Sequence, residues 1–498
     1  MIVTQNAGCT QTTYMRLYKS LVQPVFDYGA VVIPTAASEY NKCFGSIQRS
    51  AMIKASGCLS STSTEALEVL TNCVPIDLHM KLRQAQEIIR IAEKRESDPL
   101  KVEFNEWLAD TKSYTGKLTS FQLLMSIFNE LRDTIKMENI EKEFEYNREN
   151  YGLFRRREHV HTDEFKHDKE MQVENIRSVI DSCDDKTILA FTDGSALGNP
   201  GPMGAGAAVY LEGYYSTPIL LNRGVSKNSN NYAGEIVGLE IALEFLAEVK
   251  TVIQRKIHIF TDCQAAILSV FCKEVPTNKI ETISNIKRHL SKIEEGEIQT
   301  EVHWIPGHKN LMGNELADKQ AKLAAAQMGI SDAEEETGMM DAREAVNVMK
   351  EKVIKKWNYN YTSSDKTDRI QNIFSRVGLR KCIGEEHRKN FSLINQLLCG
   401  HSRLKNHWSK IDKNSSKMCD HCNTPETVEH YVFRCPNYST QRDILERTVD
   451  DILYRFNLNC SNISLSTLVG EIEDASDSAK EEFVKAFVSF IETSGRFY

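Results

Sequence analysis

The stretch Phe191-Thr192-Asp193-Gly194-Ser195 decides how the centre of this 498-residue chain is interpreted. Residues 188–191 are apolar and predict a buried strand that ends at Asp193. The same ending recurs where the apolar residues 257–260 run into Thr261 and Asp262. We expect the two strands to lie side by side, with both aspartates at the edge where open α/β sheets bind ligands. Because close carboxylates repel unless they share a cation, the pattern predicts a divalent-metal site.

The residues around these strands predict one domain over 185–327. Further strands are expected at 205–211, 218–221 and 300–305, and helices at 232–249, 264–271, 280–293 and 314–326. Glu235 falls on the apolar face of the first helix, in step with Leu239, Ala242 and Leu246. A buried carboxylate without a partner is costly, so Glu235 also needs a cation or a donor.

Taken singly, the acidic residues of this domain have ordinary structural explanations. Asp193 precedes a glycine and suits a turn, and Asp262 can cap the helix that follows it. Asp318 lies near a helix start, where a negative charge is favourable. Only the ordered set Asp193, Glu235, Asp262 and Asp318 indicates a catalytic site.

The motifs of this domain resemble those of type 1 ribonuclease H. The matching segments are Thr192-Asp193-Gly194-Ser195-x-x-Gly198-Asn199-Pro200-Gly201-Pro202-x-Gly204-x-Gly206, Ala233-Gly234-Glu235, Thr261-Asp262, His303-Trp304-Ile305-Pro306-Gly307-His308 and Gly313-Asn314-Glu315-Leu316-Ala317-Asp318. They come in the order and spacing of that family over about 140 residues. The resemblance implies an α/β fold with a mixed five-stranded sheet and helices.

The same resemblance implies cleavage of the RNA strand of RNA–DNA hybrids. Asp193, Glu235, Asp262 and Asp318 would hold two Mg²⁺ or Mn²⁺ ions, and oxygen ligands suit Mg²⁺ on chemical grounds as well. His308, in a glycine-flanked turn, would serve in proton transfer or product release; the structural alternative is a solvent-exposed turn histidine.

Substrate contacts are expected around the first and second acids. The candidates are Gly194, Ser195, Asn230, Asn231 and Tyr232. They would meet the 2′-hydroxyl groups in the minor groove, which distinguish RNA from DNA without reading sequence. Two features depart from the family. Tyr232 stands where many cellular members have an asparagine. Many cellular enzymes also insert a basic segment, the handle, after the third acid, and the corresponding residues 272–279 are short and only mildly basic.

Two helical regions are predicted outside this domain. Residues 1–145 contain Leu17-Tyr18-Lys19-Ser20-Leu21-Val22-Gln23-Pro24-Val25-Phe26-Asp27-Tyr28-Gly29-Ala30-Val31-Val32, which resembles the thumb-like region after the polymerase core in reverse transcriptases of non-LTR (LINE-type) retroelements. A helical domain with its own core is an equal alternative. No Tyr-x-Asp-Asp motif is present, so we expect the polymerase core to be absent. Residues 146–184 read as a charged linker and 328–342 as an acidic linker.

The region 343–498 contains a candidate zinc site. Cys419, Cys422, His430 and Cys435 form a Cys-x2-Cys-x7-His-x4-Cys pattern, and structural zinc takes four nitrogen or sulfur ligands. Free thiols are the alternative, and His421 is a rival ligand. The surroundings resemble the C-terminal tail that follows ribonuclease H in LINE-type elements. Such a tail would bind single-stranded nucleic acid or only hold a small domain together.

Composition limits the remaining possibilities. The length suggests about three domains, and a net charge of -8 argues against a highly basic nucleic-acid coat but not against local contacts. Thirteen cysteines without a regular framework favour reduced thiols and an intracellular protein, in the nucleus or the cytoplasm. Neither a run of about 18 apolar residues nor a signal pattern is found, so no membrane partner is expected.

These patterns together predict a ribonuclease H, a metal-dependent endonuclease, within the C-terminal part of a non-LTR retroelement polyprotein. The alternative is a catalytically silent nucleic-acid-binding or assembly remnant of such an element. The sequence identifies no protein partner and no oligomeric state.

Overall fold

A computed structural model describes most of the chain. The described residues are 9–30, 38–109, 140, 142, 159–198, 201–229, 231–249, 256–272, 279–295, 298–307, 309, 311–330, 341–378 and 388–498. The chain divides into two compact units: residues 1–84, 115–127 and 350–498 form unit 1, and residues 85–114 and 128–349 form unit 2. Among the helices of the described residues, none has both the length and the apolar composition that a bilayer-spanning segment needs.

Unit 2 is built on a mixed sheet in the order β1-β6-β5-β2-β3-β4. Its strands are β1 (His159–Val160), β2 (Thr187–Ala196), β3 (Gly201–Tyr210), β4 (Ile219–Ser229), β5 (Lys256–Thr261) and β6 (Gln299–Trp304). The pairs β2–β3 and β3–β4 are antiparallel. The pairs β2–β5, β5–β6 and β6–β1 are parallel. The fold is therefore the expected α/β fold with a mixed sheet.

Residues 185–327 contribute the expected five strands, β2 to β6, and β1 adds a sixth from outside this range, at the edge beside β6. This strand lies in the predicted linker 146–184, which also contains η3 (Thr162–Lys166) and α8 (Lys169–Asp181). Val173, Ile176 and Ile180 of α8 are buried in the core of the sheet. The linker prediction therefore fails for residues 159–181. The few apolar residues on one face of α8 are outnumbered by charged residues, so the composition of this segment did not indicate a packed helix.

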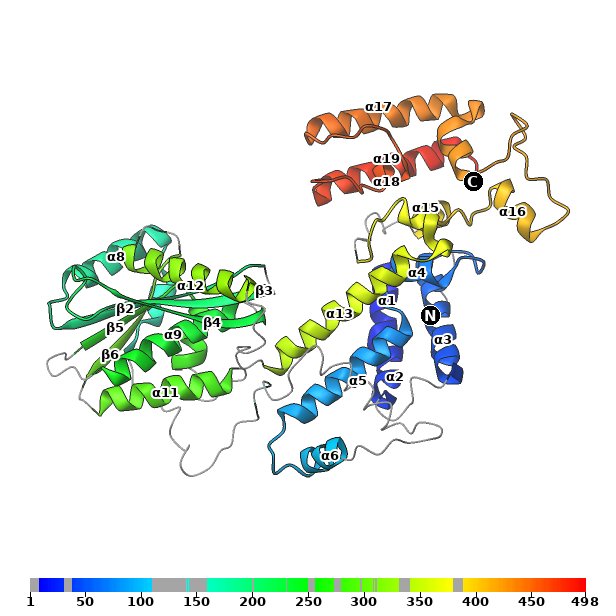
Figure 1. The fold of residues 1–498 in the computed structure, drawn as a ribbon. Coiled ribbons are helices and arrows are strands. Elements are labelled where there is room, and N and C mark those ends of the chain that lie inside the picture. The colour runs from blue at the N-terminus through cyan, green and yellow to red at the C-terminus, as the bar shows by residue number, and fades with distance from the viewer. Residues whose placement is uncertain are drawn as a thin grey trace. The chain divides into compact units, whose positions relative to one another are not determined.

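Helices cover both faces of the sheet (Figure 1). α8 and α12 (Met312–Ile330) lie on one side, and α9 (Asn231–Glu248) and α11 (Ile280–Glu294) lie on the other. Alternate residues of β2 point to the two faces: Leu189 and Phe191 join the core under α8, whereas Ile188 and Ala190 join the core over α9. The apolar run in β2 is continuous because both of its faces are buried.

Glycines of β3 bring α12 unusually close to the sheet. A Cβ atom on Gly206 would lie 2.2 Å from the carbonyl oxygen of Ala317 and 2.5 Å from the amide nitrogen of Ala321. Gly204 has an equally close contact with the backbone of the next turn of α12. These glycines therefore serve helix packing, and this packing fixes the first turns of α12, where Asp318 lies.

Replacing Gly206 by alanine is expected to destabilise unit 2 by about 3 kcal/mol, because the added methyl group meets backbone that cannot rotate away. The matched control is Gly329→Ala in the same helix, where the nearest atom to a Cβ is 3.7 Å away. That change is expected to be neutral or stabilising by up to about 1 kcal/mol. Thermal denaturation of both variants measures the difference, and equal effects would show that the contact between β3 and α12 is not tight.

Unit 1 is helical, and both ends of the chain contribute to it. Its described elements include α1 (Gln11–Leu17), η1 (Tyr18–Val22), α2 (Gln23–Gly29), α3 (Ser38–Ser56), α4 (Thr64–Thr71), α14 (Asp368–Gln371), α15 (Arg388–Cys399), α16 (Lys405–Ile411), η6 (His430–Arg434), α17 (Ser439–Arg455), α18 (Leu465–Leu468) and α19 (Asp477–Ser494). The long helices α5 (Ile76–Glu93) and α13 (Ala342–Thr362) each belong partly to unit 1, and α6 (Pro99–Ala109) belongs to unit 2. One hydrophobic core runs from Met15 to Ile491.

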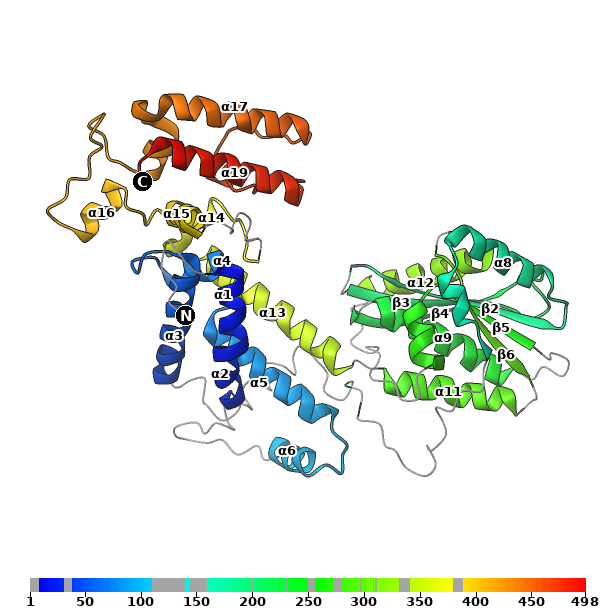
Figure 2. The same cartoon turned by 180° about the vertical axis from the view of Figure 1, so that it is seen from behind.

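The contact between the two chain ends is polar as well as apolar. Figures 1 and 2 show α3 and α4 beside α15. Asn395 donates from Nδ2 to the carbonyl oxygen of Ser56 at 2.9 Å, and Gln396 donates to that of Gly57 at 2.8 Å. These bonds satisfy the carbonyl groups at the end of α3. The predicted regions 1–145 and 343–498 are therefore not independent domains, since a shared core joins their described parts.

Candidate active site

Two neighbouring strands deliver the first pair of acids. Phe191 is opposite Phe260 and Thr192 is opposite Thr261 in the parallel pairing of β2 and β5. The two phenylalanine rings stack with their centroids 4.7 Å apart. The predicted side-by-side arrangement is confirmed, and Asp193 and Asp262 follow at equivalent positions.

Glu235 reaches the same place from α9. Its helix begins at Asn231, and Gly194 of β2 lies directly against it: a Cβ on Gly194 would be 2.5 Å from the amide nitrogen of Glu235. Gly194 is therefore required for close packing of strand and helix. A role of Gly194 in substrate binding stays a prediction.

Asp193, Glu235 and Asp262 form a compact group. Each offers a carboxylate oxygen, and these atoms lie within 4.8 Å of one another. Burial raises the pKa of Asp193 to about 8, with further contributions from Asp262 and Asp318. Burial, followed by the charges of Asp193 and Asp262, also raises the pKa of Glu235 well above its usual value.

Hydrogen bonding differs between the oxygens of Asp193 and Glu235. The backbone amide of Gly194 donates to Oδ1 of Asp193 at 2.7 Å, but Oε2 of Glu235 is buried and has no hydrogen-bond partner in the described part of the chain. A buried acceptor of this kind is expensive. Hard divalent cations prefer carboxylate oxygens, so the three residues fit such an ion.

Asp318 lies beside this group but outside the three closest acids. Its Oδ2 accepts a hydrogen bond from Nζ of Lys322, one turn further along α12, at 2.6 Å. The charge of Asp318 contributes to the raised pKa of Asp193, so the two carboxylates sense each other. Sequence reasoning missed Lys322, although its spacing of four residues from Asp318 was the available signal.

The predicted substrate residues have different surroundings. Ser195 continues β2 opposite Gly204, and Asn231 is exposed at the first position of α9. The side chain of Tyr232 packs against the core between α9 and the sheet, and its hydroxyl group is buried. Tyr232 therefore contributes to packing, and a role in substrate binding stays a prediction. Asn230 and His308 lie outside the described residues.

The raised pKa of Asp193 leads to a prediction about stability. Between its unfolded value near 4 and about 8, the folded protein binds more protons than the unfolded chain, so stability falls as pH rises through this window. A bound cation can offset the carboxylate charge at pH values where the protons are lost. Mg²⁺ at 100 times its dissociation constant adds about 2.7 kcal/mol to the free energy of unfolding. We expect the gain in melting temperature on replacing EDTA with Mg²⁺ to be large at pH 8 and small at pH 5. The same gain at both pH values would contradict the assignment.

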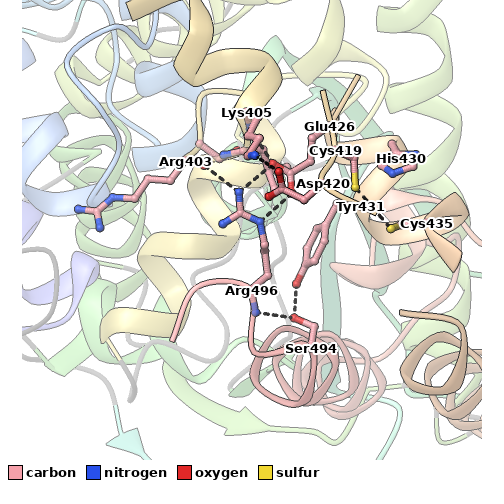
Figure 3. A network of polar contacts seen from close by, with 12 residues as sticks. Arg403, Lys405, Cys419, Asp420, Glu426, His430, Tyr431, Cys435, Ser494 and Arg496 are labelled. Atoms are coloured by element: carbon pink, nitrogen blue, oxygen red, sulfur yellow. Dashed lines mark hydrogen bonds and ion pairs between the residues drawn. The ribbon is translucent and has the colours of Figure 1, made fainter. Parts of the chain in front are cut away.

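A second cluster of metal-ligand type lies in unit 1 (Figure 3). The structure brings together Cys419, Cys422, His430 and Cys435, with their ligand atoms within 4.8 Å of one another; three of them, Cys419, His430 and Cys435, are labelled in Figure 3. Sγ of Cys435 is 3.9 Å from Sγ of Cys419 and 3.8 Å from Sγ of Cys422. A tetrahedral site with metal–sulfur bonds of about 2.3 Å requires sulfur–sulfur distances of about 3.8 Å, so the spacing fits. The rival ligand His421 is exposed and outside the group.

Contacts around the cysteine cluster hold it against the last helix. Glu426 is buried and accepts two hydrogen bonds from Arg496, at 2.7 and 2.8 Å. Tyr431, next to His430, forms a hydrogen bond of 2.7 Å with Ser494 at the end of α19. The cluster is therefore part of the core of unit 1 and not an appended loop.

Comparison with known proteins identifies the domain in unit 2. A family model described as RNase H matches residues 185–326. A ribonuclease H of Proteus mirabilis is 32% identical over 169 residues, which are 32% of this chain and 97% of that protein. A ribonuclease HI of Vibrio parahaemolyticus is 28% identical over 163 residues, 31% of this chain and 96% of the relative. Among solved structures, LC11-RNase H1 in complex with an RNA/DNA hybrid is similar, with 23% identity, coverage of 28% of this chain and 98% of that chain, and a TM-score of 0.22. The chain belongs to the ribonuclease H family, and its ribonuclease H domain makes it a hydrolase.

Proposed function

We propose that this protein cleaves the RNA strand of RNA–DNA hybrids by hydrolysis of phosphodiester bonds, with two divalent cations held by Asp193, Glu235, Asp262 and Asp318. The observation that carries the proposal is the group of three carboxylates, in which Asp193 and Glu235 are buried and Asp262 is half-buried, and in which Oε2 of Glu235 has no hydrogen-bond partner among the described residues. The motif resemblance to type 1 ribonuclease H supports the hybrid as substrate.

The residues of the chain provide the binding and the charge that such a reaction needs. Asp193, Glu235 and Asp262 bring three carboxylates together at one end of the sheet, and a bound cation would offset their mutual repulsion. When bound, a pair of Mg²⁺ or Mn²⁺ ions would activate water and stabilise the charge on the leaving oxygen. Lys322 neutralises Asp318 when no cation is near. His308 is proposed to move a proton or assist product release.

Recognition of the hybrid is proposed to depend on the edge formed by β2 and the start of α9. Ser195 and Asn231 lie there, and Gly194 and Asn230 precede or adjoin them in the sequence. Small polar residues at this edge suit contacts with 2′-hydroxyl groups across a minor groove.

The test of this function is cleavage of an RNA–DNA hybrid that carries a different label on each strand. With Mg²⁺ or Mn²⁺ the purified chain should cut only the RNA strand, and EDTA should stop the reaction. A DNA duplex of the same sequence is the control. Tight binding of the hybrid without cleavage in either metal would favour the alternative function, a silent nucleic-acid-binding remnant.

We further propose that the protein derives from a non-LTR retroelement and acts in the nucleus or the cytoplasm. The motif in residues 17–32 and the cysteine–histidine pattern of residues 419–435, on either side of the ribonuclease H domain, support this origin. Both segments contribute to the single core of unit 1, which suits two parts of one ancestral protein. The C-terminal region is proposed to bind single-stranded nucleic acid.

Zinc is the metal that we propose for Cys419, Cys422, His430 and Cys435. Three sulfur atoms and one imidazole suit this ion, and Nδ1 of His430 lies 3.2 Å from the hydroxyl oxygen of Thr424, which orients the ring. Burial and the neighbouring cysteines raise the pKa of Cys435 to about 11, so the thiol of Cys435 stays protonated unless a bound cation stabilises its thiolate.

A further inference from the structure

A cluster of histidines and glutamates lies in unit 2 on strands β5 and β6, apart from the carboxylate site. His258 is directly opposite Glu301, and Phe260 is opposite His303, in the parallel pairing of these strands. The side chains of His258 and His303 are almost fully buried, and that of Glu301 is 21% exposed. None of these residues takes part in the hydrolysis described above.

The atoms of this cluster converge on one point. Nδ1 of His258 is 2.9 Å from Nε2 of His303, and each of these nitrogens is 3.7 Å from Oε2 of Glu301. A point in the plane of the three atoms lies about 2.0 Å from each, the length of zinc–nitrogen and zinc–oxygen bonds. Two nitrogens in a tetrahedral site are about 3.3 Å apart, so the rings need to separate by only a few tenths of an ångström.

A second carboxylate prepares His303 to act as a ligand. Nδ1 of His303 is 2.9 Å from Oε1 of Glu164, and the backbone amide of Trp304 donates to Oε2 of the same residue at 2.8 Å. A carboxylate oxygen accepts, so the proton of His303 sits on Nδ1 and the lone pair of Nε2 faces His258. Histidine ligands of metals commonly donate their other ring proton to a carboxylate in this way.

Charge and access also suit a cation. Glu164 and Glu301 bring two carboxylates, and the ammonium group of Lys256 lies with Nζ 2.6 Å from Oε1 of Glu301. On the solvent side, His161 stacks on His303 with a centroid distance of 4.3 Å, and its Nε2 is 3.2 Å from Oε2 of Glu301. The side chain of His161 is 27% exposed, which leaves a path from solvent.

We propose that His258, His303 and Glu301 form a binding site for a transition-metal ion of the zinc class, with water as the fourth ligand. Imidazole and carboxylate ligands suit zinc and cobalt, whereas Mg²⁺ prefers oxygen ligands alone. Through Glu164 the bound ion would also hold η3 and β1 against the edge of the sheet.

The test uses the full chain with Mg²⁺ in excess, to fill the carboxylate site, and with one equivalent of Zn²⁺. The thiolates of the cysteine cluster are expected to bind this Zn²⁺ first. Co²⁺ is then titrated and followed by visible absorption and equilibrium dialysis. We expect one Co²⁺ per chain, with ligand-field bands and without the intense near-ultraviolet band of a cobalt–thiolate bond. No bound Co²⁺, or Co²⁺ with only the thiolate signature, would overturn the proposal.

Variants distinguish ligands from residues that only support the fold. Glu301→Gln and His303→Gln should each weaken Co²⁺ binding at least about tenfold, and Glu164→Gln should weaken it about tenfold to a hundredfold. Lys256→Met should strengthen binding at least about threefold, because it removes a nearby positive charge. Exposed His159 is the control, and His159→Gln should change nothing. Unchanged affinity in folded Glu301→Gln protein would sink the proposal, even where the buried His303→Gln variant fails to fold.

Discussion

Asp193→Asn should reduce cleavage of the RNA strand by at least about a thousandfold, the largest effect that we expect on activity. The asparagine keeps the size of the side chain but removes a charged oxygen from the group formed with Glu235 and Asp262. Cation binding contributes several kcal/mol to stabilisation of the transition state, and each 1.36 kcal/mol corresponds to a factor of ten in rate. The rate is measured with labelled hybrid at saturating Mg²⁺.

The same substitution should make the metal-free protein more stable at pH 8. Burial and two neighbouring acids raise the pKa of Asp193, so its charge at this pH opposes folding, and the neutral amide removes that cost. A variant that only damaged the fold would lose stability together with activity. The control is Asp185→Asn, an exposed aspartate just before β2, which should keep full activity. Retained cleavage by Asp193→Asn would refute the assigned site.

Loss of the proposed zinc ion should have the largest effect on stability. Cys435→Ala removes a ligand from the cluster that includes Cys419, and the side chains of Tyr431 and Val432 next to it belong to the main core of unit 1. Loss of a structural metal is among the few changes that cost more than about 4 kcal/mol. We expect a chelator to produce the same loss in the wild-type chain.

Hydrogen exchange locates this effect. Amide protection should fall in α19 and in residues 419–438, because Glu426 and Tyr431 connect the cluster to the end of α19. Protection in β2 and β5 of unit 2 should stay unchanged. Cys43→Ser, at an exposed cysteine, is the control and should retain the zinc ion of the cysteine cluster. A folded Cys435→Ala protein with full protection in α19 would refute a structural role for zinc.

The sequence predicted those features whose signal is local. Phe-Thr-Asp occurs twice after an apolar run, and parallel strands with the same ending must place their aspartates together. The inward face of Glu235 followed from helical periodicity, and its burial agrees. The spacing of Cys419, Cys422, His430 and Cys435 likewise lies within seventeen residues. Short-range patterns of this kind need no knowledge of the partner surface.

Features that depend on distant segments were missed. A two-residue strand such as β1 has no periodicity to detect, and only the edge of β6 defines it. Gly204 and Gly206 were noted only as part of the matched motif, but the backbone of α12 occupies the space above them. The site proposed at His258, Glu301 and His303 became visible only through the register of β5 and β6.

The shared core of unit 1 has a consequence for synthesis of the protein on the ribosome. Ser56 and Asn395 are hydrogen-bonded although more than three hundred residues separate them in the sequence. Translation at about 5–20 residues per second delays this contact by roughly 15 to 70 seconds. Helices α1 to α4 therefore leave the ribosome long before α15, which packs against α3, exists, whereas the ribonuclease H domain emerges with all of its strands. The early helices must remain in a chaperone-dependent or loosely folded state until the last segment arrives, and premature termination would leave their apolar faces uncovered.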